Sequence, residues 1–117
     1  MEIKQQRQTL DLLCSQALIW INQDPYLVLK EKSVLHENFR NISSQAANIN
    51  ALFDKALQNN AIQASDAERL ELIAQSSNQL DALVNACRSL DAQARLLSQQ
   101  RAKSAKENHV LRKLYGL

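Results

Sequence analysis

Glycine, proline and aromatic residues are nearly absent from this chain of 117 residues, which has one glycine, one proline and 4% aromatic residues. A β-sheet needs β-branched and aromatic residues in its strands and glycine in its turns, so the composition argues against a sheet. Alanine, leucine, glutamine, asparagine and serine dominate instead. We therefore predict an all-α protein, and the length suits a single domain.

Long apolar runs and a strong net charge are also missing. No stretch approaches the ~20 apolar residues of a membrane-spanning helix, and residues 1–10 lack the pattern of a signal peptide. The formal net charge is only +2, so we expect no nucleic-acid partner. Residues 93–117 carry six basic side chains against Glu107 alone, which suits either an acidic partner or a solvated helix face.

Recognisable catalytic and metal-binding patterns are absent as well. His36 and His109 stand without cysteine or carboxylate at the spacing of metal ligands, and one glycine cannot build a phosphate-binding loop. We predict no enzymatic activity, no metal and no cofactor. Cys14 and Cys87 fall on apolar helix faces, so we interpret them as reduced core residues of a cytosolic protein, with a disulfide as the alternative.

The first helix is predicted over residues 3–22. Its apolar residues recur at helical spacing along one stripe, which comprises Ile3, Leu10, Leu13, Cys14, Ala17, Trp20 and Ile21. Three more apolar residues lie off the stripe and indicate packing between two partners: Leu12, Leu18 and Ile19. Asp24 and Pro25 are predicted to end this helix and begin the next, since proline suits a first helical position. One kinked helix is the alternative.

The second helix is predicted over residues 25–58. Two sets of apolar residues recur every seven positions, as in a coiled coil: Val28, Leu35, Ile42, Ile49 and Ala56, and then Phe39, Ala46 and Phe53. Asn59 and Asn60 suit the end of a helix, and Ser65 with Glu68 forms a capping box that begins the third helix.

The third helix is predicted over residues 66–114, since nothing interrupts it before Gly116. Its apolar face comprises Ile73, Ser76, Leu80, Leu83, Cys87, Leu90, Ala94 and Leu97. At 1.5 Å per residue it would be roughly 70 Å long, against roughly 50 Å for the second helix. We predict an elongated antiparallel three-helix bundle or coiled coil whose C-terminal helix overhangs, with residues 101–117 mobile.

The predicted overhang ends on apolar residues. Val110, Leu111, Leu114 and Tyr115 cluster on one helical face without an evident partner in the chain. An exposed apolar patch at such an end usually marks a docking site for another protein. The alternatives are that the tail bends back onto the bundle or pairs within a dimer.

Several segments resemble the flagellar type III export chaperones of the FlgN type, which are small, glycine-poor, all-helical proteins. The matching segments are LDLLCSQAL at 10–18, DPYLVLKEKSVL at 24–35 and LDAQARLLSQQ at 90–100. The family often ends its conserved region on Leu-Tyr-Gly, and Leu114-Tyr115-Gly116 matches that tripeptide.

The resemblance implies a cytoplasmic chaperone that binds the C-terminal helical segment of hook-filament junction proteins and prevents their premature assembly. It would then deliver them to the membrane export gate, with the export ATPase complex as a further candidate partner. Expected substrate-binding residues are Leu90, Leu97, Arg101, Val110 and Leu111, and expected gate-docking residues are Leu114 and Tyr115. The chain would be a monomer or a weak homodimer.

Two other functions fit the same patterns. One is a sister chaperone of the same export system, of the filament-cap type, whose length and ending are similar. The other is a structural coiled-coil homodimer or adaptor with no export role.

Overall fold

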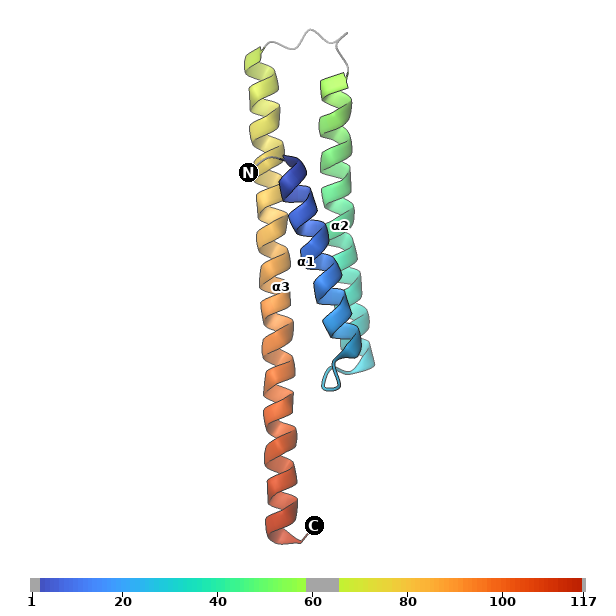
Figure 1. The fold of residues 1–117 in the computed structure, drawn as a ribbon, viewed down its shortest axis with the longest axis vertical. Coiled ribbons are helices and arrows are strands. Elements are labelled where there is room, and N and C mark those ends of the chain that lie inside the picture. Colours follow the sequence, from blue (N-terminus) through green and yellow to red (C-terminus); the bar gives the residue numbers. More distant parts are fainter. Residues whose placement is uncertain (1–2, 59–65, 117) are drawn as a thin grey trace.

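The computed structural model describes residues 3–58 and 66–116, which form three α-helices. Helix α1 spans Ile3–Gln23, α2 spans Leu29–Gln58 and α3 spans Asp66–Tyr115. Figure 1 shows α2 and α3 antiparallel and side by side, with α1 lying over both and running in the direction of α3. The molecule measures 78 × 20 × 16 Å. The prediction of an elongated all-α bundle is confirmed.

The core lies where α1 covers the α2–α3 pair. From α1 it receives Leu10, Cys14, Ala17 and Ile21, at the spacing of one helical stripe. The buried residues opposite them are Phe39 and Ala46 from α2, and Leu80, Val84, Cys87 and Ala94 from α3. Many of these side chains are small, so the helices approach closely.

Two residues off the α1 stripe do not pack as predicted. Leu12 and Ile19 are exposed, while Leu18 is half-buried against the core. Helix α1 contacts both other helices, but it does so through one stripe, because it lies in the groove between them and its outer side faces solvent. The prediction of two apolar contact faces is therefore wrong for Leu12 and Ile19.

Helix α2 begins at Leu29, so the prediction that it begins at Pro25 is wrong. The carboxylate of Asp24 accepts hydrogen bonds from the amides of Tyr26 (3.0 Å) and Leu27 (2.9 Å), which forms a turn instead of a first helical turn. The side chain of Leu27 is buried in the core and holds this turn in place. The alternative of one kinked helix is also wrong, since the turn separates α1 from α2.

The start of α2 is capped by its own residues. Glu31 Oε1 accepts a hydrogen bond from the amide of Val28 at 2.9 Å, and the amide of Lys32 donates to the Val28 carbonyl at 3.0 Å. This is half of a capping box, with the glutamate reaching back to the residue before the helix. Val28 therefore lies outside the helix and is exposed, so its predicted place in the coiled-coil face is wrong.

The remaining predicted faces of α2 and α3 are largely confirmed. Leu35, Ile42 and Ile49 are half-buried against the core, as are Leu83, Leu90 and Leu97 of α3. Ile73 is only partly covered, with 38% of its surface exposed. The side chain of Ala56, the helix end at Asn59 and Asn60, and the capping role of Ser65 lie outside the described residues.

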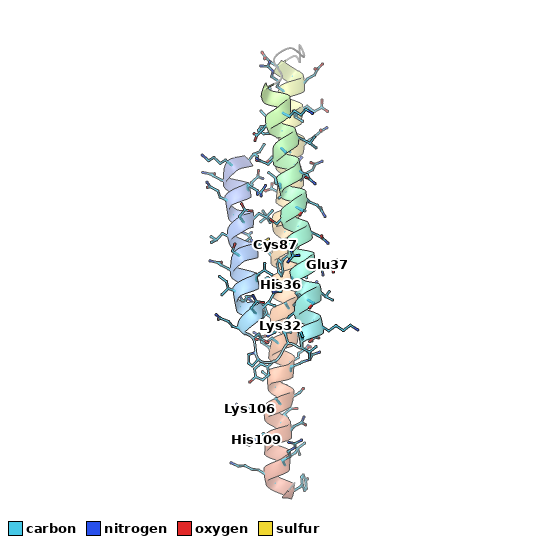
Figure 2. All side chains as sticks on the ribbon, turned by 90° about the vertical axis from the view of Figure 1, so that its right-hand side faces the viewer. Lys32, His36, Glu37, Cys87, Lys106 and His109 are labelled. Atoms are coloured by element: carbon cyan, nitrogen blue, oxygen red, sulfur yellow. The ribbon has the colours of Figure 1, made fainter. Side chains whose placement is uncertain are left out.

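Polar contacts set the position of α1 on its neighbours. Trp20 Nε1 donates a hydrogen bond to Asp91 of α3 at 2.7 Å, and Arg95 lies over the Trp20 ring at 4.7 Å from its centre. On the other side, His36 Nε2 lies 2.5 Å from Asn22 Oδ1; Figure 2 labels His36 on α2. Because these groups pair at one relative position only, they set the register of the helices.

Replacing Leu80 with aspartate tests the core. Leu80 is fully buried, and an unpaired carboxylate there costs several kcal/mol, comparable with the whole stability of about 5–15 kcal/mol. We expect Leu80→Asp to lose most helical signal in far-UV circular dichroism. Leu70→Asp, on the same helix but 66% exposed, should melt like the wild type. A folded Leu80→Asp protein would contradict this description of the core.

Candidate protein-docking surface

Helix α3 continues well beyond the other two helices. Figure 1 shows its C-terminal part extending past the turn between α1 and α2. Ala94 and Ser98 are buried, whereas every residue from 103 to 116 is exposed. The predicted overhang is therefore present and begins after Ala102, while the mobility of residues 101–117 stays a prediction.

The overhang carries an apolar surface, the C-terminal stripe, made of Val110, Leu111, Leu114 and Tyr115. Val110 and Leu111 are each 48% exposed, and Leu114 and Tyr115 are 72% and 73% exposed. The first two line a shallow hollow of about 580 Å³ together with Lys103, Lys106 and Glu107. Large apolar side chains gathered on a lone helix are typical of a surface that another chain covers.

Gly116 ends the helix directly after the stripe. Its φ of 68° lies in the left-handed region, where a glycine commonly follows the last helical residue. The glycine of the Leu-Tyr-Gly tripeptide therefore has a structural role as a helix stop. Leu114 and Tyr115 occupy the last turn and remain free of contacts that bury them.

The overhang is strongly basic. Glu107 is the only acidic residue from 103 to 116, whereas four positions are basic: Lys103, Lys106, Arg112 and Lys113. Figure 2 shows Lys106 and His109 on the part of α3 that lies beyond the other helices. Pairing two such stripes would bring like charges together, whereas acidic side chains on a partner would be attracted.

A second apolar hollow, the α2–α3 groove, lies where the bundle ends. It has a volume of about 370 Å³ and is lined by Lys30, Glu31, Val34, Leu35, Leu90, Gln93, Ala94 and Leu97. Helix α1 does not contribute to its lining. Leu90 and Leu97, both predicted to bind substrate, thus lie in one groove, although each also packs against the core.

The groove continues toward one edge of the stripe along α3. Leu90, Gln93 and Leu97 line the groove. At about 100° per residue, Leu111 lies about 60° around the helix from Leu90 and about 40° from Leu97, so it shares their face, whereas Leu114 lies about 120° from Leu90. From Leu90 to Leu111 this face is roughly 32 Å long at 1.5 Å per residue. The arrangement can accommodate one extended helix.

Arg101 stands between the groove and the stripe but is already engaged. Its guanidinium binds the Glu31 carboxylate through both terminal nitrogens, one of them at 2.6 Å from Glu31 Oε2, and it reaches the Tyr26 carbonyl at 3.5 Å. Hydrogen bonding to Arg101 lowers the pKa of Glu31 below its usual value. Arg101 therefore joins α3 to the start of α2, and its role in substrate binding stays a prediction.

Asp24 makes the second link between the turn and α3. Besides the two turn amides, its carboxylate accepts a hydrogen bond from Ser98 Oγ at 2.7 Å. Burial by itself raises the pKa of Asp24, but the hydrogen bonds from Ser98 and from the amides of Leu27 and Tyr26 outweigh it, so the pKa is lowered. The ionised carboxylate is thus part of the folded structure.

Sequence reasoning missed the contribution of α2 to this surface. Lys30, Val34 and Leu35 line the groove, but only Leu35 belonged to the predicted apolar face. The available signal was an apolar residue directly beside a core position, as with Val34 next to Leu35 and Leu96 next to Leu97. Such pairs widen the apolar face of a helix beyond what one neighbour can cover.

Within residues 3–58 and 66–116, no group of three or more histidine, cysteine, aspartate or glutamate side chains could hold a metal ion. None of the helices in this part of the chain combines the length and hydropathy that crossing a membrane requires. The surface described above can bind through apolar contact and charge.

Replacing Asp24 with alanine tests the turn. Losing its three hydrogen bonds should lower the free energy of unfolding by about 1–3 kcal/mol at pH 7, measured by urea denaturation. Because the folded pKa is lowered, this contribution exists above the usual pKa of about 4 and is lost as the pH falls through the lowered value. The difference from wild type should therefore shrink in acid.

Asp11→Ala is the matched control for this substitution. Asp11 pairs along α1 with Arg7, at 3.1 Å, on an exposed surface. Its removal should cost at most about 0.5 kcal/mol. Equal effects of the two substitutions would contradict the role assigned to Asp24.

No family model, curated protein or solved structure matches the chain. The likeness to FlgN-type chaperones therefore rests on the sequence segments named above.

Proposed function

We propose that this protein is a cytoplasmic export chaperone of the FlgN type. It binds the C-terminal helical segment of hook-filament junction proteins, prevents their premature assembly and delivers them to the flagellar type III export gate. The observation that carries the proposal is the uncovered C-terminal stripe on a helix that outlasts its own bundle. The Leu-Tyr-Gly ending and the leucine-containing segments support it.

In this mechanism the substrate segment forms a helix along α3. It covers Val110 and Leu111 and reaches the α2–α3 groove at Leu97 and Leu90, over a path of roughly 32 Å. Each large apolar side chain that becomes fully buried contributes about 1.5–3 kcal/mol, and ordering the substrate helix offsets part of this gain. The balance gives moderate, reversible binding, as a carrier requires. The covered substrate face is no longer free to polymerise.

Leu114 and Tyr115 serve a second contact in this proposal. They are the most exposed residues of the stripe and occupy the last turn before Gly116. A substrate helix that occupies the face from Leu90 to Leu111 leaves this end available to the export gate. The chaperone can thus hold its cargo and contact the gate at once.

Charge favours another protein over a second copy at this surface. The basic residues of the overhang repel their counterparts in a second copy, and they attract acidic residues flanking the apolar face of a substrate helix. The alternative hypothesis of a structural homodimer is tested by analytical sedimentation. A tight dimer that buries the C-terminal stripe of both copies would contradict the chaperone role. A sister chaperone of the filament-cap type is distinguished by which exported protein co-purifies.

Replacing Leu111 with aspartate tests capture. The substitution places a charge at the centre of the stripe, so co-purification of a co-expressed junction protein should fall at least tenfold. The melting temperature should stay close to that of wild type, because Leu111 is 48% exposed and lies within the exposed stretch 103–116. Leu97 is less suitable, since it packs against the core.

Leu12→Asp is the matched control for capture. Leu12 is also an exposed leucine on a helix, 57% exposed, but it lies on the outer side of α1 away from the stripe. It should retain normal capture. Loss of capture in both variants, or in neither, would argue against the assigned surface.

The double substitution Leu114→Ala with Tyr115→Ala separates gate docking from capture. Both side chains are exposed, so helicity and melting should be nearly unchanged. We expect capture of the junction protein to persist while binding to the purified cytoplasmic domain of the gate component is lost, as measured by calorimetry. Unfolding of the double variant would place these residues in the core and overturn the assignment.

A further inference from the structure

The two cysteines of the chain meet in the core. Cys14 of α1 and Cys87 of α3 are 73 residues apart, yet their Sγ atoms lie 3.7 Å from each other, and both are free thiols. They are the only cysteines in the sequence. Since the S–S bond of a disulfide is about 2.05 Å long, the sulfurs need to approach by only ~1.7 Å. Figure 2 shows Cys87 at the level where all three helices overlap.

Each thiol also borders a surface hollow beside α1. Cys14 lines one of about 290 Å³ with Ser15, Leu18 and Phe39, between α1 and α2. Cys87 lines another of about 120 Å³ with Gln16 and Arg88, between α1 and α3. Cys14 is 6% exposed and Cys87 is fully buried, so peroxide from either hollow reaches the pair when α1 moves away from its neighbours.

We propose that Cys14 and Cys87 are a disulfide-forming pair that hydrogen peroxide oxidises, linking α1 covalently to α3. One thiol attacks the peroxide, the O–O bond breaks, and a sulfenic acid and water form. The sulfur of the second thiol then attacks the sulfenic acid sulfur, and the S–S bond forms as the S–O bond breaks. The departing hydroxide takes up the proton of the second thiol and leaves as a second water. In total two thiols lose two electrons and two protons, and one peroxide becomes two waters.

Burial keeps both cysteines in the protonated thiol form. Burial raises the pKa of Cys14. Burial, and to a smaller extent the neighbouring Cys14, raises the pKa of Cys87 to about 12. Thiolate is therefore scarce at neutral pH and oxidation is slow unless α1 loosens. Once formed, the disulfide closes a long loop and restricts the unfolded chain, so the oxidised protein should be more stable. The link lies away from the C-terminal stripe and acts independently of the proposed export function.

The test is peroxide treatment of the full, folded chain. We expect an intact mass lower by two hydrogens, a faster monomer band on a non-reducing gel, and a melting temperature higher by about 10 °C. Dithiothreitol should reverse all three. Cys14→Ala and Cys87→Ala, tested separately, should show neither the mass loss nor the shift.

Three results would overturn the proposal. They are an unchanged mass, oxygen addition or intermolecular dimers in place of the internal link, and an oxidised protein that melts at a lower temperature than the reduced one. The wild-type chain carries the decisive measurement, so the outcome does not depend on whether the alanine variants fold.

Discussion

The attachment of the α1–α2 turn to α3 determines where the three-helix core stops. Asp24 accepts a hydrogen bond from Ser98, and Glu31 binds Arg101, so both ends that meet at the turn are fixed to one level of α3. The chain cannot add another layer beyond that level, because α1 has ended and α2 runs back from it. Everything that α3 carries after Ala102 is therefore left to solvent or to a partner.

The interior of the bundle and its open surface obey different requirements. Alanine, cysteine and serine lie at several buried positions, which allows the helices to approach closely, while Phe39, Leu10 and Leu80 fill the remaining volume. The close approach also brings the two thiols into contact. Past the core, apolar residues return on α3 with no helix against them, and they are flanked by lysine and arginine. Packing within the bundle explains the buried residues. It does not explain the exposed apolar residues of the overhang.

Sequence reasoning predicted the fold well and the surface in part. Three helices, their apolar faces and the overhang follow from seven-residue and three-four spacing together with a difference in helix length. The errors lie where local signals competed with contacts from distant residues. Pro25 suits a first helical position, but Asp24 and the buried Leu27 hold that stretch in a turn. In the sequence, Arg101 looks like a basic residue that is free to bind a partner. In the structure it is bound by Glu31, which is distant along the chain.

By itself, the sequence determined the helices and the excess length of the last one, because periodicity and the near absence of glycine and proline act locally along the backbone. Tertiary structure decided which of the apolar residues are buried in the core and which stay exposed. Leu97 and Leu111 look alike in the sequence, yet one packs against the core and the other is left open. The physical reason is that burial depends on whether a neighbouring helix reaches that level, which the turn at Asp24 sets.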